Sequence, residues 1–207
     1  MINPTAEKLF DQAHPSAQRN VEPIVKAVSP LLPASGLVLE VASGGGYHSA
    51  VLAGANPNLT WQPTDPNPDA QGRIAKSVAD AALPNLKTPL ELNAEAEDWP
   101  VETAAAMLCC NMIHIAPWSA AEGLFAGAGR VLSVGGVLFL YGPFKVDGQH
   151  TAQSNESFQE WLQNQDPAWG VRDAEAVDAL GAQVGLGLEH TIEMPSNNML
   201  RVYRRSE

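Results

Sequence analysis

Residues 37–53 read LVLEVASGGGYHSAVLA, and this stretch decides which fold we expect. Residues 37–41 are a short apolar run of the kind that makes a buried strand, and residues 48–53 are an apolar helical stretch. The glycines at 44–46 lie between them, and glycine permits a tight turn because it lacks a Cβ atom. The stretch therefore predicts a strand, a glycine turn and a helix in succession.

The same alternation of strands and helices continues on both sides of this stretch. Upstream, Asn20 is placed to cap a helix over residues 21–28. Downstream, apolar runs predict strands that belong in a parallel sheet covered on both faces. The expected strands cover 59–63, 88–93, 104–110 and 137–141, and the expected helices cover 68–82 and a segment that Pro117 opens.

The last third of the chain distinguishes between kinds of doubly wound fold. Helical spacing recurs over 158–162 and 177–184, and two extended segments follow at 188–194 and 200–204. The connection between those segments is too short for a crossover helix, so we expect them to pair antiparallel. The sequence therefore predicts an α/β fold with a doubly wound, mostly parallel, seven-stranded sheet and a C-terminal antiparallel hairpin. This is the Rossmann-like topology of class I methyltransferases.

Length and composition limit the number of domains and the classes of partner. With 207 residues we expect one domain, made of an N-terminal arm or lid over 1–20 and a core over 21–207. The formal net charge of −11 repels nucleic-acid phosphates, and no apolar stretch approaches the roughly 20 residues of a membrane span. The adjacent Cys109 and Cys110 suit a reducing compartment. We expect a cytoplasmic protein whose partner is a small-molecule substrate, not a nucleic acid or a membrane.

Two acidic residues indicate which ligand the glycine turn serves. Asp65 lies nineteen residues after Gly46, where a carboxylate can accept both hydrogen bonds of a ribose diol. Glu40 precedes the glycines and suits the ammonium of an amino-acid-bearing cofactor, which S-adenosylmethionine provides. Two observations disfavour a dehydrogenase. Its pyrophosphate would face the carboxylate of Glu40, and Ser49 occupies the third position of the dehydrogenase glycine pattern, where glycine or alanine is needed. The structural alternatives are a solvated Asp65 at a strand end and a buried, paired Glu40.

Polar residues at later strand ends are further candidates. Asn93, followed by the small Ala94, can receive an adenine amino group, although an asparagine there is also typical of a turn. His114 follows the strand at 104–110 and can face a substrate as a base or a hydrogen-bond donor. The alternative is that His114 holds the neighbouring loop in place.

Three other kinds of site are disfavoured. Residues 65–76 begin like a calcium loop but carry Ala70 and Lys76 at the sixth and twelfth positions, where glycine and an acid are needed. The histidines and cysteines lack the spacing of zinc ligands. Ser43 lacks the flanking glycines of a nucleophile elbow. We therefore expect neither a metal site nor a serine hydrolase.

Several blocks of the sequence together resemble a small methyltransferase-like family of unknown function. The blocks are EVASGGGYH at 40–48, NMIHIAPW at 111–118, GGVLFLYGPF at 135–144 and DPAWGVRD at 166–173. The resemblance covers residues 15–203 and implies a class I fold with S-adenosylmethionine as the cofactor. It implies no particular substrate.

The resemblance also implies roles for individual positions. It places the turn at the methionine end of the cofactor and Asp65 at the ribose, and it brings Arg19 and Asn20 near the pocket, where Arg19 can pair with the cofactor carboxylate. With the candidates above, the expected cofactor contacts are Arg19, Asn20, Glu40, Ala42, Ser43, Gly44, Gly46, His48, Asp65, Asn93, Ala94, Asn111 and Met112, and the expected catalytic residues are His114, Tyr141 and Asn155.

Two functions of different classes follow from these residues. The favoured one is transfer of the methyl group of S-adenosylmethionine to a small acceptor, a reaction that needs alignment and exclusion of water more than a catalytic motif. The alternative is a protein that binds S-adenosylmethionine without transferase activity, as a sensor or a subunit of a larger complex. A dehydrogenase is a distant third. The residues expected to shape the acceptor site are His114, Tyr141, Phe144, Asn155 and Trp169.

Overall fold

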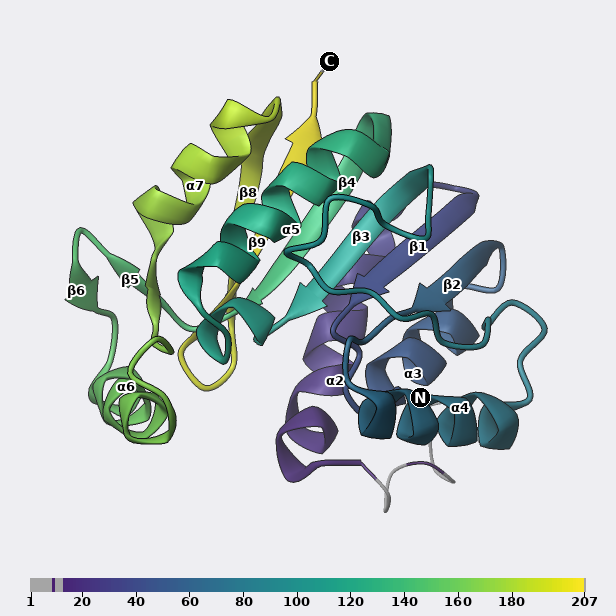
Figure 1. Ribbon diagram of the computed structural model, residues 1–207, viewed down its shortest axis with the longest axis horizontal. Coiled ribbons are helices and arrows are strands. Elements are labelled where there is room, and N and C mark those ends of the chain that lie inside the picture. Colours follow the sequence, from purple (N-terminus) through teal and green to yellow (C-terminus); the bar gives the residue numbers. More distant parts are fainter. Residues whose placement is uncertain (1–8, 10–12, 207) are drawn as a thin grey trace.

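The computed structural model describes Leu9 and residues 13–206, and it has a layered α/β architecture (Figure 1). A six-stranded sheet in the order β2-β1-β3-β4-β9-β8 forms the middle layer. Its strands are β1 (Gly36–Val41), β2 (Leu59–Pro63), β3 (Ala104–Cys110), β4 (Leu132–Gly142), β8 (Leu186–Met194) and β9 (Asn198–Arg205). The helices are α2 (Pro15–Val28), α3 (Tyr47–Ala55), α4 (Pro68–Ala81), α5 (Trp118–Val131), α6 (Gln153–Gln165) and α7 (Ala174–Gln183), with short 3₁₀ turns η1 (Ser29–Leu31) and η2 (Met112–His114).

The sheet is mixed, with its antiparallel strands at the C-terminal end of the chain. β1 is parallel to β2 and β3, and β3 is parallel to β4. β9 is antiparallel to both β4 and β8. The predicted C-terminal hairpin is therefore confirmed, and β2 and β3 have the bounds that the apolar runs predict.

The expected strand at 88–93 is wrong, so the sheet has six strands instead of seven. This segment runs beside β2 but forms only isolated parallel bridges, one of them between Thr64 and Leu90. Pro63 on β2 and Pro89 on the segment have no N–H group, so the ladder of hydrogen bonds is interrupted in the middle of the pairing. The seventh position is filled by irregular extended chain.

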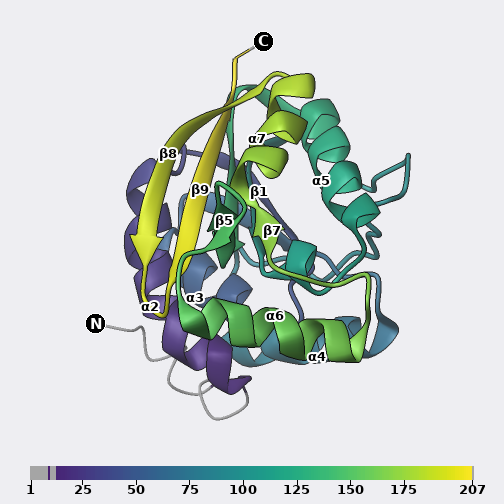
Figure 2. The same ribbon diagram turned by 90° about the vertical axis from the view of Figure 1, so that its left-hand side faces the viewer.

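Alternate residues of the central strands face two separate apolar cores. On β1, Val38 packs with α2 and α3, while Leu39 packs with α5 and α7. Figure 2 shows these two pairs of helices on opposite sides of the sheet. The central strands are buried on both faces, which explains why their sequences are continuous apolar runs instead of alternating ones.

The first described helix, α2, begins at Pro15, so the predicted cap at Asn20 is wrong. His14 caps the helix instead, because its side chain accepts a backbone N–H of the first turn and proline at the first helical position needs no N–H partner. Pro23 lies inside this helix. Arg19 and Asn20, which the sequence places in an arm, belong to α2.

The predicted arm over residues 1–20 lies partly outside the described residues, which include Leu9 and then 13 onward. Leu9 is buried in the core that α2 and α3 share, in the same cluster as Val21 and Tyr47. No helix in the described part of the chain is long and apolar enough to cross a membrane.

Residues 143–173 form an addition between β4 and α7. It contains α6 and a small sheet of β6 (Gln149–His150), β5 (Phe144–Val146) and β7 (Arg172–Asp173). In Figure 1, β5, β6 and α6 extend away from the main sheet on the side opposite β2. The sequence predicts only the helical spacing here, because strands of two or three residues are too short to show a period.

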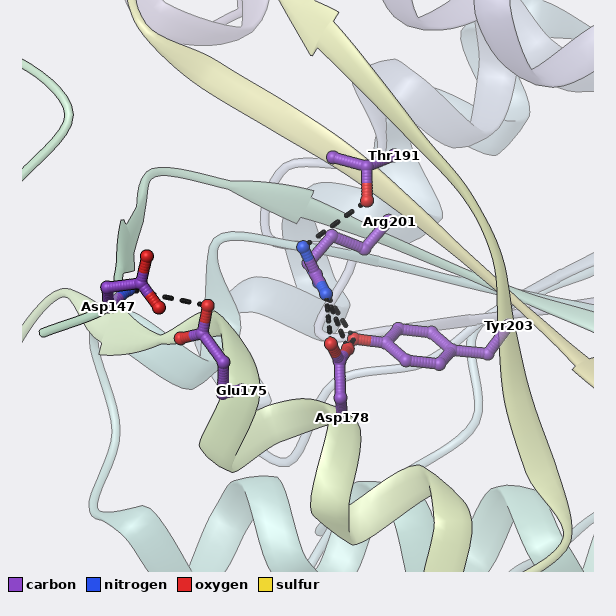
Figure 3. A network of polar contacts seen from close by, with 6 residues as sticks. All are labelled: Asp147, Glu175, Asp178, Thr191, Arg201 and Tyr203. Atoms are coloured by element: carbon purple, nitrogen blue, oxygen red, sulfur yellow. Dashed lines mark hydrogen bonds and ion pairs between the residues drawn. The ribbon is translucent and has the colours of Figure 1, made fainter.

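An ionic network around the buried Arg201 fastens α7 to the C-terminal hairpin (Figure 3). Arg201 on β9 is 4% exposed, and its guanidinium contacts both carboxylate oxygens of Asp178 on α7 at 2.5 Å. The Tyr203 hydroxyl donates to Asp178 at 2.8 Å and accepts from Arg201 Nε at 3.0 Å. Because the buried cation has a charged partner, its burial is compatible with a stable fold.

We expect Asp178→Asn to lower the free energy of unfolding by about 3 kcal/mol, because it leaves the Arg201 guanidinium buried without a charged partner. Urea denaturation followed by circular dichroism measures this change. The control is Asp80→Asn, which removes the exposed ion pair with Lys76 and should cost no more than about 0.5 kcal/mol. Equal losses in the two variants would contradict this role of Arg201.

Candidate functional site

The glycine turn connects β1 to α3 at the C-terminal edge of the parallel strands. Gly44 and Gly46 have left-handed φ angles of 61° and 76°, and Ala42 has one of 58°. A Cβ atom on Gly46 would lie 3.1 Å from the Ile74 Cα atom, so α4 packs closely against the turn. A Cβ atom on Gly44 or Gly45 would meet nothing within 4 Å. The turn therefore exposes open backbone on one side, as close approach of a cofactor requires.

Asp65 follows β2 and is held against this turn. Its Oδ2 accepts the Gly44 N–H at 3.0 Å, and its Oδ1 accepts the Asn67 N–H at 3.0 Å. Each carboxylate oxygen retains a second acceptor position, so the group can also receive two hydroxyls. The structure thus brings together the glycine turn and the acid that the sequence spacing connects.

Glu40, at the end of β1, is 2% exposed and already has two side-chain partners. Its Oε2 accepts from Trp61 Nε1 at 2.6 Å and from Ser49 Oγ at 2.8 Å. Burial raises the pKa of this carboxyl to about 7, and the two hydrogen bonds oppose that rise. Neither partner can be identified from the sequence, because both contacts depend on how β2 and α3 pack beside β1.

Asn20, His48 and Tyr141 form a polar cluster beside the glycine turn. Asn20 Oδ1 lies 2.8 Å from His48 Nε2, and the Asn20 side chain is also hydrogen-bonded to the Tyr141 hydroxyl. Desolvation lowers the pKa of His48 to about 4 and raises that of Tyr141. Arg19, the neighbour of Asn20 on α2, is exposed. The structure therefore joins three of the predicted residues and leaves Arg19 at the surface.

Three other predicted cofactor contacts have structural partners. Ser43 Oγ donates to the Glu40 carbonyl oxygen at 3.2 Å and accepts the Thr64 N–H at 3.2 Å, which ties the turn to the end of β2. Asn93 is exposed, and its side chain accepts the N–H of Glu95 at 3.1 Å, as a turn residue does. Ala94 is buried, and its carbonyl oxygen lies against α5.

The loop after β3 carries Asn111, Met112 and His114. Asn111 has a left-handed φ of 62° and begins η2, in which Met112 and His114 are buried. The His114 ring lies edge-on to Phe144, with 5.2 Å between ring centroids, and neither ring nitrogen has a hydrogen-bond partner among the described residues. Burial lowers the pKa of His114 to about 3, and the charge of Arg172 acts in the same direction. His114 is therefore neutral at pH 7.

Arg172 holds this loop, and it is absent from the residues expected from the sequence. Its Nε donates to the Ile113 carbonyl oxygen at 2.8 Å, its Nη2 donates to that of Ala116 at 2.6 Å, and its guanidinium lies over the Trp118 ring. The Gly170 N–H donates to the His114 carbonyl oxygen at 3.0 Å. Two blocks far apart in the sequence, 111–118 and 166–173, therefore form one structural unit.

Asn155, at the start of α6, is 4% exposed. Its hydrogen-bond partners are not those of the polar cluster of Asn20, His48 and Tyr141. Its Nδ2 donates to Thr151 Oγ1 at 3.0 Å and to the Asn197 carbonyl oxygen at 2.9 Å. Asn155 therefore fixes α6 to the turn between β8 and β9.

Two further observations concern the surface away from the turn. Among the described residues no group of three or more His, Cys, Asp or Glu side chains is arranged to hold a metal ion. A groove of about 550 Å³ runs between α2 and the edge strand β8, with Pro23, Ile192 and Met194 in its walls. The residues of the glycine turn do not line it.

Comparison with protein families supplies one match over most of the chain. The family described as "Protein of unknown function (DUF938)" matches residues 11–205.

The fold is also similar to those of solved methyltransferases. An O-methyltransferase family 2 protein from Planctomyces limnophilus, solved with apigenin, has a TM-score of 0.80 at 16% identity over 96% of this chain and 61% of its own. An O-methyltransferase family protein from Burkholderia thailandensis gives 0.75 at 17% identity over 97% and 63%, and CalO1 of calicheamicin biosynthesis, in its SAH-bound form, gives 0.74 at 18% over 92% and 54%. This chain thus spans between 54% and 63% of their lengths. The α/β fold with a mixed sheet is that of class I methyltransferases.

We expect Gly142→Ala to destabilise the protein by about 1–3 kcal/mol, because the added Cβ would lie 2.3 Å from Nε2 of the fully buried His114 ring. The matched control is Gly72→Ala on α4, where a Cβ meets nothing within 4 Å and alanine should stabilise the helix by about 0.5–1 kcal/mol. Thermal and urea unfolding measure both changes. A neutral Gly142→Ala would show that the loop moves freely.

Proposed function

The chain belongs to the DUF938 family, whose function is unknown, and we propose that it is an S-adenosylmethionine-dependent methyltransferase acting on a small-molecule acceptor. The observation that carries this proposal is the position of Asp65, 3.0 Å from the Gly44 N–H, at a turn with open backbone. The free acceptor positions of this carboxylate suit the two hydroxyls of a ribose. The fold supports the same class of ligand.

The residues around the turn fit the amino-acid end of S-adenosylmethionine. Glu40 is a buried carboxyl whose pKa lies near neutrality, so a neighbouring ammonium would favour its charged form. Gly44 leaves open backbone at the turn, and Ala42 and Gly46 shape the turn through their left-handed φ angles. We assign the carboxylate end of the ligand to the cation of Arg19, which is exposed on α2. Ser43 contributes by fixing the turn to β2.

We assign the adenine end to the loops that follow β2 and β3. Asn93 and Ala94 form a turn whose amide side chain can face an adenine amino group, and Asn111 and Met112 begin the loop after β3. The left-handed Asn111 directs the chain away from the strand, as loop residues that contact a ligand commonly do.

Methyl transfer mainly requires that the protein align the acceptor with the methyl group and exclude water. When bound, S-adenosylmethionine supplies an electrophilic methyl group on a sulfonium. We propose that Tyr141 orients the acceptor as a neutral hydrogen-bonding group and that the enclosed His114 ring holds the loop after β3 in place, because a histidine with a pKa of about 3 is a poor base at pH 7. Asn155 acts on the acceptor side by holding α6 against the hairpin. The net charge of −11 favours a neutral or cationic acceptor over an anionic one.

The enclosure of His114 supports a second candidate function. Its side chain is completely buried, and its ring nitrogens have no partner among the described residues, so it offers no accessible base. A protein that binds S-adenosylmethionine as a sensor or complex subunit needs no such base. Release of S-adenosylhomocysteine from S-adenosylmethionine in the presence of an acceptor distinguishes the enzyme from the sensor.

We expect S-adenosylmethionine and S-adenosylhomocysteine to raise the melting temperature and NAD to leave it unchanged. Ligands stabilise the native state by selective binding, by about 2.7 kcal/mol at a hundredfold excess over Kd. Differential scanning fluorimetry with the three ligands at equal concentration measures the effect. A rise with NAD alone would replace the proposed cofactor with a dinucleotide.

We expect Asp65→Ala to weaken S-adenosylhomocysteine binding by about ten- to a hundredfold, which corresponds to the loss of hydrogen bonds to a charged group. Isothermal titration measures Kd. The control is Asp69→Ala, an exposed acid in the first turn of α4, which should leave Kd unchanged. Equal affinities for Asp65→Ala and the unaltered protein would remove Asp65 from the binding site.

A further inference from the structure

Asn20 joins three elements that meet beside the glycine turn. It lies on α2, and its Oδ1 is 2.8 Å from Nε2 of His48, in the first turn of α3. The same side chain is hydrogen-bonded to the hydroxyl of Tyr141, at the C-terminal end of β4. One amide therefore connects the helix that follows the glycine turn with the strand end assigned to the acceptor.

Hydrogen-bond chemistry fixes what each partner can do. An amide oxygen accepts hydrogen bonds and cannot donate them, so His48 Nε2 must carry the proton in this contact. A neutral imidazole carries one proton, so Nδ1 of His48 is left as an acceptor. The other polar group of Asn20 is its NH₂, which can donate to the Tyr141 hydroxyl.

We propose that Asn20 is a positioning residue that locks His48 in the Nε2–H tautomer, so that His48 Nδ1 is kept as a hydrogen-bond acceptor for an ammonium group bound at the glycine turn. The inference rests on the proposed function, because the amino-acid end of S-adenosylmethionine supplies that ammonium. Asn20 does not itself touch the ligand in this proposal. It acts through His48, and the Tyr141 contact fixes its amide in the required orientation.

The groups around His48 define the pH behaviour that follows. Tyr47 lies beside it, with 6.4 Å between ring centroids, and Tyr141 is reached through Asn20; burial raises the pKa of both tyrosines, so they stay uncharged near neutrality. The Glu40 carboxyl at the end of β1 has a pKa of about 7 and titrates in every variant, so affinities are compared as ratios to the unaltered protein.

The test uses Asn20→Asp, which keeps the shape of the side chain and places a carboxylate opposite His48 Nε2. The carboxylate raises the pKa of His48, so at low pH the ring is an imidazolium, has no acceptor at Nδ1 and repels an ammonium. We expect S-adenosylhomocysteine to bind this variant about tenfold or more weakly than the unaltered protein at pH 6, and within about threefold at pH 8.5. Isothermal titration at both pH values gives the two ratios.

A second measurement needs no ligand. Long-range ¹H–¹⁵N spectra of protein labelled at histidine nitrogens identify the tautomer of His48. We expect Nε2–H alone in the unaltered protein and a mixture of tautomers in Asn20→Ala. The control is Gln18→Glu, which adds a negative charge to the same helix and should change neither the tautomer nor the pH dependence of the affinity ratio.

Two outcomes would overturn the role of Asn20: an unchanged Nε2–H tautomer in Asn20→Ala, or an Asn20→Asp affinity ratio that is the same at pH 6 and pH 8.5. A general loss of structure would weaken binding equally at both pH values and therefore counts against the proposal. If the unaltered protein binds no S-adenosylhomocysteine, the proposed function fails, while the tautomer spectra still decide whether Asn20 controls His48.

Discussion

The hydrogen bond from the Gly44 N–H to the Asp65 carboxylate determines the geometry of the candidate site. It is possible because β1 and β2 are parallel and in register, with Glu40 opposite Pro63, so that the chain leaves both strands at the same edge. Backbone bonds from Thr64 to Glu40 and from Ser43 to Thr64 extend this pairing past the strand ends. The acid and the glycine turn are consequently fixed to one another by the sheet itself, before any ligand binds.

Burial of Glu40 has a different physical consequence. A carboxyl that is 2% exposed loses its hydration, and the hydrogen bonds from Trp61 and Ser49 compensate only in part, so its pKa rises to about 7. A cationic ligand group would restore the charged form. The hydrogen bonds from Trp61 and Ser49 explain why an acid is tolerated in the core.

The shape of the loop after β3 depends on Arg172. Its guanidinium bonds to the carbonyl oxygens of Ile113 and Ala116, and the Gly170 N–H bonds to that of His114. These contacts connect the segments at 111–118 and 166–173, which are far apart in the sequence. They also show that part of these segments serves the shape of the loop, because a planar fork of donors satisfies several carbonyl groups that would otherwise be buried without partners.

The sequence by itself determined the strands of the six-stranded sheet, the antiparallel hairpin and the pairing of the glycine turn with Asp65, because apolar periods, glycine and short connections act locally along the chain. The absence of a strand at 88–93 could not be predicted from the sequence, because it depends on Pro63 and Pro89 facing each other when this segment runs beside β2. Likewise, the partners of Glu40, the amide of Asn20 between His48 and Tyr141, and the contacts of Arg172 with its loop were decided only by tertiary structure. Each of these joins residues that are distant in sequence, and no local pattern encodes the register and packing that bring such residues together.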